Sequence, residues 1–289
     1  EGLMTRPALE WLLRAPEAGA WELEVSYLTN GLNWSADYAA LLSADDARLD
    51  LDGWVTLDNQ SGGSLSEARI KLVAGEIHRV GATGPRVEAK SIEAASTVAQ
   101  SALMGYQLYD IQRLISLRDN QTRQLAFTSA PDVQVEKVLI FQGAPDVVVS
   151  AGDAILDGTY GAYARRAAQI WLEFLNEEGS GLGLPLPAGT VRIYRADADG
   201  AVQFVGEDQI GHTPLGEALR LYVGDATQVV GERVQTSYRQ LGEREAEESY
   251  QITLRNRGPE GVSVRVVERL FRAQDARIIA SSEDYAQID

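Results

Sequence analysis

The 289-residue chain has no cysteine and only two histidines, His78 and His212. Without cysteine, the chain has no disulfide bond, no thiolate metal ligand and no thiol nucleophile. Neither histidine lies in a His-x-x-x-His or Glu-x-x-His spacing, the patterns that place two metal ligands on one helix face. Any histidine chemistry would therefore combine a single histidine with carboxylates from elsewhere in the chain.

Long apolar runs and basic residues are also scarce. No apolar run approaches the roughly 20 residues of a membrane-spanning helix, so we expect no transmembrane segment. Lys and Arg number 26 against 42 Asp and Glu, which gives a net charge of −16. Such a surface repels phosphate backbones and argues against nucleic acid as a partner. It favours solubility and divalent cations, and a solvated acidic surface is its simplest interpretation.

Motifs for nucleophilic catalysis and phosphate binding are missing as well. The chain contains neither Gly-x-Ser-x-Gly nor Ser-x-x-Lys. The glycine-rich segment 179–183 is followed by neither Lys-Ser nor Lys-Thr, so we interpret it as an elbow of the chain rather than a phosphate loop. The sequence therefore assigns no catalytic, cofactor-binding or metal-binding residue, and we expect no cofactor.

The chain does contain alternating apolar residues separated by turns, which is the pattern of β-strands. Apolar residues occupy every second position from Trp21 to Tyr27, so residues 9–27 are predicted to form a hairpin, with a helix over residues 7–15 as the alternative. Further strands are predicted at residues 32–42, 49–57, 68–74, 106–111, 114–117, 124–127, 133–141, 229–239, 250–254 and 262–270, and two strand-like runs lie within the stretch 171–222, which begins at Trp171.

Because helical periodicity nowhere persists beyond about ten residues, the predicted fold class is all-β, an antiparallel β-sandwich assembly with a C-terminal immunoglobulin-like unit. We expect a β-sandwich domain over residues 1–230, with a long loop at residues 81–104, and a smaller Ig-like unit over residues 231–289. A short helix is predicted at residues 92–103. The C-terminal unit has too few predicted strands to close a sandwich alone.

A weak internal repeat connects these strands. Three times, a strand ends in asparagine and turns through glycine before another alternating strand begins, at Asn59, Asn176 and Asn256. Asparagine hydrogen-bonds its own turn and tolerates the left-handed region of the backbone. Units of strand, asparagine turn and strand are typical of Ig-like sandwiches.

Several motifs together resemble one family, the bacterial envelope family catalogued as domain of unknown function 4139, which is related to mucoidy-inhibitor-A-like proteins. The resemblance covers nearly the whole chain and implies an exported, β-rich protein without assigned catalytic residues. Larger relatives carry an N-terminal partner domain and a coiled coil that are absent from this sequence. The motifs are WSADY (34–38), WVTLDNQSG (54–62), KLVAGE (71–76), LPAGTVRIY (186–194), GEDQIGHTP (206–214) and ESYQITLRN (248–256).

Two short segments are candidate sites for ions or catalysis. His212 lies close in sequence to Glu207, Asp208 and Glu217, so it is a candidate general base or metal ligand, and otherwise a histidine that stabilises a turn. The segment Asp197-Ala-Asp-Gly200 resembles the opening of a calcium loop, but the later ligands are missing and a plain hairpin turn is the simpler interpretation.

Four tryptophans lie on predicted strands, namely Trp21, Trp34, Trp54 and Trp171. Each is predicted to pack in the core, with a platform for carbohydrate or lipid as the alternative.

Two functions of different classes follow from these observations. The first is a non-enzymatic cell-envelope protein that acts as a structural or protein-interaction module; the second is a metal-dependent hydrolase that uses His212 with nearby carboxylates. The shortage of histidine and of nucleophile motifs favours the first. Its partner would be another envelope protein or a second copy, bound through open β edges, above all the edge formed by residues 262–280. The expected location is extracytoplasmic, in the periplasm or cell envelope, with any signal peptide already removed.

Overall fold

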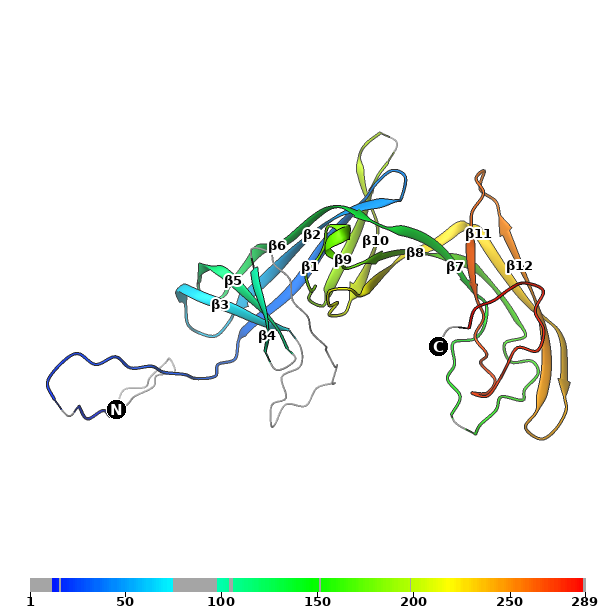
Figure 1. The fold of residues 1–289 in the computed structure, drawn as a ribbon, viewed down its shortest axis with the longest axis horizontal. Coiled ribbons are helices and arrows are strands. Elements are labelled where there is room, and N and C mark those ends of the chain that lie inside the picture. Colours follow the sequence, from blue (N-terminus) through cyan, green and yellow to red (C-terminus); the bar gives the residue numbers. More distant parts are fainter. Residues whose placement is uncertain are drawn as a thin grey trace.

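The computed structural model describes residues 12–15, 17–74, 98–103, 106–150, 152–197 and 199–287. Within this part of the chain the fold is all-β, as predicted, and the only helical element is the short 3-10 turn η1 (Glu178–Ser180) in the glycine-rich elbow. The strands form three sheets that follow one another along an elongated molecule (Figure 1).

The central sheet has five strands, in the order β10-β9-β1-β2-β6. Its pairs are antiparallel except for β1 and β9, which run parallel. Burial alternates along β1, because Ala36, Tyr38 and Ala40 face the core while Asp37 and Ala39 face outward. The bounds are β10 (Val202–Ile210), β9 (Gly189–Ala196), β1 (Leu32–Leu42), β2 (Arg48–Asn59) and β6 (Gln121–Gln134).

A small sheet lies at one end of the central sheet and a C-terminal sheet at the other (Figure 1). The small sheet has the order β3-β5-β4 and consists of β3 (Leu65–Ala74), β5 (Tyr106–Leu117) and β4 (Val98–Leu103). The C-terminal sheet has the order β12-β11-β8-β7-β13 and consists of β12 (Ala246–Asn256), β11 (Ala218–Gln240), β8 (Tyr163–Leu175), β7 (Glu136–Gln142) and β13 (Val264–Val267). β13 pairs with β7 in the parallel sense.

One large apolar core joins the central sheet to the small sheet and to the adjoining halves of β8 and β11. Tyr109 of β5 lies in this core and makes edge-to-face contacts with Trp34 and Phe127. The C-terminal sheet has only a minor apolar cluster of its own, built around Leu139, Ala168 and Val229. Its outer half must therefore be held by other interactions, which are described below.

Strand β11 connects the two cores, because Leu221 is buried in the large one and Val229 in the minor one. It is 23 residues long and pairs with β8 on one side and β12 on the other. The predicted domain boundary at residue 230 lies within this strand, so the two predicted units share β11. The division of the chain into domains 1–230 and 231–289 itself stays a prediction.

The predicted N-terminal hairpin is wrong for the residues that the structure describes. Residues 12–15 and 17–30 contain no strand, and Trp21 is 57% exposed. Alternation indicates that a segment can join a sheet, but a strand forms only where another strand supplies its hydrogen bonds. Residues 1–11 lie outside the described part.

The region around the predicted loop at residues 81–104 also differs from expectation. Residues 98–103, which belong to the predicted helix, form β4 and pair with β5. Pairing to a neighbouring strand has overridden a weak local preference. Residues 81–97 and 104 lie outside the described residues, as does His78.

Several predicted strand boundaries are corrected by the structure. Residues 106–117 form one strand, and the predicted strand 133–141 is divided between β6 and β7. Pro131, which cannot donate a ladder hydrogen bond, lies within edge strand β6 next to a shift in register. The predicted strand 262–270 is reduced to Val264–Val267.

The three asparagines of the repeat occupy equivalent turns but differ in burial. Asn176 directly follows β8 and is fully buried, and its Nδ2 donates to the carbonyl oxygens of Leu184, Thr213 and Pro214 at 2.9, 3.2 and 3.0 Å. Asn59 is equally buried. Asn256 is exposed and donates to one carbonyl, that of Glu260. The repeat predicted the turns correctly. Because the asparagines differ in burial, we expect them to differ in how much they contribute to stability.

We expect Asn176→Ala to lower the free energy of unfolding by about 2–4 kcal/mol, because it leaves buried carbonyl groups without donors. The matched substitution Asn256→Ala, at an exposed turn, should cost less than about 1 kcal/mol. Urea denaturation of both variants measures the difference. Equal losses would contradict the role assigned to burial.

Candidate functional site

The most elaborate polar cluster in the described residues lies in the outer half of the C-terminal sheet and is centred on two buried arginines, Arg233 and Arg272. Arg233 is fully buried and has the largest side chain of all residues buried to that degree. On β11, Val229, Gly231 and Arg233 occupy alternate buried positions. The local sequence therefore directs a guanidinium group inward, where it requires a counter-charge.

Glu268 supplies this counter-charge for Arg233. The Nε atom of Arg233 lies 2.9 and 3.0 Å from the two carboxylate oxygens, and Nη2 lies 2.5 Å from Oε1. Nη1 donates to the carbonyl oxygen of Gly161 at 2.6 Å. The guanidinium carbon is 3.2 Å from the centre of the Tyr250 ring and 5.6 Å from that of Phe271. The charge is thus both paired and stacked on aromatic faces.

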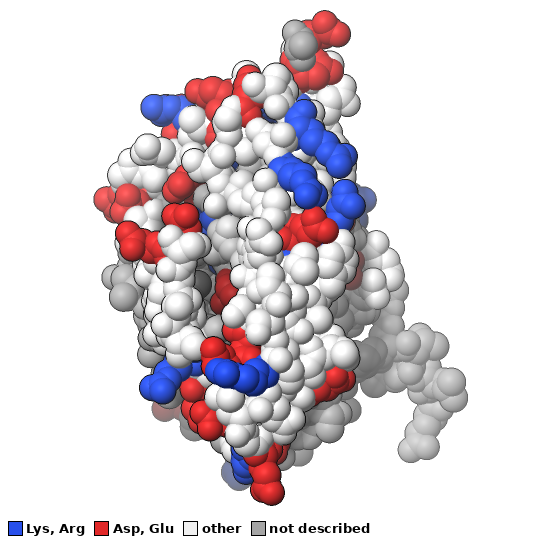
Figure 2. Space-filling view, turned by 90° about the vertical axis from the view of Figure 1, so that its right-hand side faces the viewer, with Lys and Arg blue, Asp and Glu red and all other residues white. Residues whose placement is uncertain are grey.

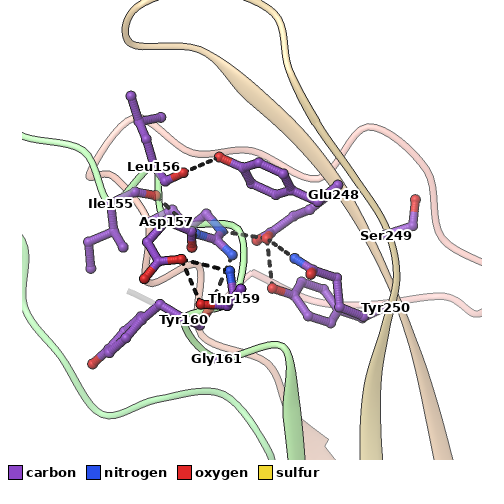
Figure 3. A network of polar contacts seen from close by, with 12 residues as sticks. Ile155, Leu156, Asp157, Thr159, Tyr160, Gly161, Glu248, Ser249 and Tyr250 are labelled. Atoms are coloured by element: carbon purple, nitrogen blue, oxygen red, sulfur yellow. Dashed lines mark hydrogen bonds and ion pairs between the residues drawn. The ribbon is translucent and has the colours of Figure 1, made fainter.

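Arg272 is held in a similar way, by the loop residues that Figure 3 labels from Ile155 to Tyr160 and by Glu248. Its Nε donates to Glu248, Nη1 donates to the carbonyl oxygens of Ile155 and Asp157 at 3.0 and 2.9 Å, and Nη2 donates to that of Tyr160 at 3.1 Å. The loop that precedes β8 therefore places its carbonyl groups around one side chain. A loop whose carbonyls point inward needs such a donor.

The carboxylate of Glu248 connects this cluster to β12. Besides Arg272, its Oε2 accepts hydrogen bonds from the Tyr250 hydroxyl at 2.6 Å and from Gln235 at 3.2 Å. Burial, followed by the hydrogen bond to Glu248, raises the pKa of the Tyr250 hydroxyl. Tyr250 therefore remains a neutral donor at physiological pH.

Every guanidinium nitrogen of both arginines already donates to an acceptor within the chain. This arrangement holds the 143–162 loop and the C-terminal segment against β11 and β12. Packing around Arg233 is close, since a Cβ at Gly143 would lie 2.8 Å from the Cβ of Arg233. We assign the cluster a structural role.

A shallow hollow of about 240 Å³ lies on the outer face of the central sheet. Arg192 crosses it, with Nη1 3.3 Å from Asp37 and Nε 3.8 Å from Glu207. An aromatic ring in such a hollow can stack against a planar or ring-shaped ligand. Arg192 already pairs with Asp37 and Glu207, so these residues leave no unpaired charge for such a ligand. The residues that line the hollow are Asp37, Tyr38, Ala39, Trp54, Gln124, Arg192 and Tyr194.

His212 lies apart from both sites. Its Nδ1 accepts the backbone N–H of Ala188 at 3.1 Å, and the adjacent residue Thr213 forms a β-bridge with Leu186. Nearby Asp208 uses Oδ2 to accept the N–H of Tyr222. Burial lowers the pKa of the imidazole. These contacts make His212 a latch between two chain segments.

The turn at Asp197–Gly200 is the hairpin that joins β9 to β10. The Oδ1 of Asp197 accepts the backbone N–H groups of Asp199 and Ala201, and its Oδ2 accepts a hydrogen bond from Gln203. These bonds lower the pKa of the carboxyl group, and the hydrogen bond from Gln203 is the largest cause. The carboxylate thus organises its own turn, which supports the hairpin interpretation; calcium binding at this turn stays a hypothesis.

Of the four tryptophans predicted for the core, one packs against it. Trp34 contacts the large core, whereas Trp21 is exposed. Trp54 lines the outer hollow, because its neighbour Val55 takes the inward position. Trp171 is partly buried and contacts the Tyr222 ring in a tilted arrangement, and the guanidinium carbon of Arg220 lies 5.0 Å from the centre of the Trp171 ring.

Sequence reasoning missed the arginine cluster. Its signal was a charged residue at an inward position of an alternating strand, as at Arg233 on β11 and Glu248 on β12. Each demands a buried partner of opposite charge. The partners lie 35 and 24 residues away in the sequence, so spacing does not reveal them.

Within the described ranges, His, Asp and Glu side chains form no group of three that could hold a metal ion. The same part of the chain contains no helix that is long and apolar enough to cross a membrane. A family model described as Domain of unknown function (DUF4139) matches residues 23–287. Neither a curated protein nor a solved structure matches the chain.

We expect Arg233→Met to lower the free energy of unfolding by about 3 kcal/mol, because it leaves Glu268 and a buried carbonyl group without their donor. The control is Arg239→Met, also on β11, whose side chain pairs with Glu247 at an exposed position and should matter by less than about 1 kcal/mol. Chemical denaturation compares the two. The double variant Arg233→Met/Glu268→Leu should recover part of the lost stability. If Arg239→Met lost as much stability as Arg233→Met, the buried ion pair would not be the cause.

The His212 latch predicts a pH dependence. The pKa of His212 is lower in the folded state than the unfolded value of about 6.5, so its contribution is complete above pH 6.5 and is lost as the pH falls below it. His212→Asn keeps an acceptor but does not titrate. Relative to this variant, the wild-type chain should lose stability between pH 7 and pH 5. Parallel stability profiles of the two proteins over this pH range would contradict the prediction.

Proposed function

The chain belongs to the DUF4139 family, and from this membership and its open sheet edges we propose that it is a non-enzymatic protein-interaction module of the cell envelope. Its partner would be an extended segment of a neighbouring polypeptide, another envelope protein, which adds as a strand along β12. Strand addition is a recurrent mode of recognition, in which backbone hydrogen bonds supply affinity and alternate side chains supply specificity.

The observation that carries the proposal is the free edge of β12. Among the described residues, β12 is the outermost strand of the C-terminal sheet and pairs with β11 alone. Its 11 residues present an edge of roughly 35 Å. The edge expected at residues 262–280 is much shorter, because β13 has four residues.

The arginine cluster makes this edge suitable for binding. Natural edges are often protected by proline, by lysine or by inward-pointing charges, and β12 contains neither proline nor lysine. Its inward charge, Glu248, is paired with Arg272. The inner face of β12 is thus held by the arginine cluster, while its outer edge has no partner strand among the described residues and can pair with an added strand. On this end of the molecule, acidic and basic side chains are interspersed (Figure 2), so recognition there would depend on backbone pairing rather than on a field of one sign.

Localisation outside the cytoplasm belongs to the same proposal. It is supported by the resemblance of motifs such as WVTLDNQSG and GEDQIGHTP to those of mucoidy-inhibitor-A-like envelope proteins.

The test is site-specific cross-linking in intact bacteria. A photoreactive side chain at Ser249, exposed on β12, should give a discrete adduct with one polypeptide, whereas the same group at Asp52, exposed on central-sheet strand β2, should not. Adding Thr253→Lys places a charge at the edge and should reduce the Ser249 adduct at least about tenfold. Equal adducts at positions 249 and 52, or none at 249, would refute binding along β12.

The alternative, a metal-dependent hydrolase that uses His212, is tested on the same purified protein. Stoichiometric metal that disappears in His212→Ala would support the hydrolase and overturn the non-enzymatic assignment. Unchanged metal content in that variant, together with cross-linking at Ser249, would support the interaction module.

A further inference from the structure

The N-terminal segment 20–30 has the sequence of a strand but lies outside every sheet of the described structure. Trp21, Leu23 and Tyr27 occupy alternate positions and are 57%, 62% and 70% exposed. The intervening positions carry Glu22 and Glu24. An extended segment with this alternation buries its apolar face only by joining a sheet whose own apolar face continues beside it.

Strand β3 offers an edge that matches this segment. Among the described residues, β3 pairs with β5 only, so its other side is free. Its inward positions include Leu72, which is buried, and Ile70, which is only partly covered by the core. Its outward positions include Arg69 and Lys71. The edge thus combines uncovered apolar surface on one face with basic residues on the other.

The chain itself brings the segment to this edge. The N–H of Gln60 donates to the carbonyl oxygen of Gly31 at 2.6 Å, which fixes the end of the segment close to the start of β3 at Leu65. Gly31 has φ +84°, and a Cβ there would lie 2.5 Å from the Gln60 carbonyl oxygen, so the position requires glycine. A reversal of the chain direction at residues 29–30 would bring residues 28 to 21 beside β3 in the antiparallel sense.

We propose that residues 21–28 form the fourth strand of the small sheet by antiparallel addition to the free edge of β3. With Leu23 opposite Ile70, the apolar residues of the segment extend the inner face of the sheet. The same register places Glu22 opposite Lys71 and Glu24 opposite Arg69, so opposite charges face one another across the strands. A register shifted by one residue would point the tryptophan and tyrosine rings into solvent.

The occupant of the β3 edge is the segment of the same chain rather than that of a second copy. A tether of a few residues gives the segment an effective concentration near the millimolar range at its own edge. Addition covers the exposed apolar side chains and closes an edge that would otherwise template pairing with other chains. This inference does not depend on the binding proposed along β12.

The absence of cysteine permits a direct test by disulfide trapping in the full chain. Two double variants, Glu24→Cys/Arg69→Cys and Leu23→Cys/Ile70→Cys, sample both classes of antiparallel cross-strand pair. The control, Glu24→Cys/Gln203→Cys, pairs the segment with an exposed residue of β10.

Under mild oxidation, at least one of the two test variants should form a disulfide within one chain at least about tenfold faster than the control, as shown by non-reducing gels and peptide mapping. Disulfides only between chains would assign the edge to a second copy and overturn the proposal. Rates equal to the control in both test variants would also overturn it. In the unmodified protein, amide hydrogens of residues 21–28 should exchange at least about tenfold more slowly than those of the exposed turn 61–64, and equal exchange would count against docking.

Discussion

Burial of two guanidinium groups is the constraint on which the C-terminal part of the molecule depends. The apolar cluster of its sheet is small, so Arg233 and Arg272, together with the buried rings of Phe141 and Phe271, form the interior of its outer half. Each arginine supplies what apolar side chains cannot, namely donors for the inward carbonyl groups of a long loop and a flat surface for aromatic rings. The arrangement is stable only as a whole, because removing one partner leaves the other buried without its counterpart.

The fold could be predicted wherever its cause is local. Period-2 alternation located most strands of the central sheet, and the asparagine repeat located three turns, because both effects act within a few residues. Prediction failed where the cause is distant. Residues 98–103 became a strand through pairing with β5, whereas the segment around Trp21 has the pattern of a strand but belongs to no sheet of the described structure.

The candidate sites show the same division. The hairpin at Asp197 was predicted from its Asp-Gly turn, and its cause is local, because the carboxylate accepts from backbone groups two and four residues away. His212 drew attention for its chemistry, yet its contact is to a backbone group 24 residues away that no motif encodes. The inward position of Arg233 could have been read from alternation along β11, but its pairing with Glu268 follows only from the parallel alignment of β13 with β7.

The length of β11 has a mechanical consequence. This strand begins in the large core and continues into the sheet that carries the arginine cluster, and it remains paired with β8 over most of the way. Tension between the two ends of the elongated molecule would act along this ladder in shear, so that many hydrogen bonds must break together rather than one after another. A module anchored at one end and pulled at the other would therefore resist stretching through a single shared strand.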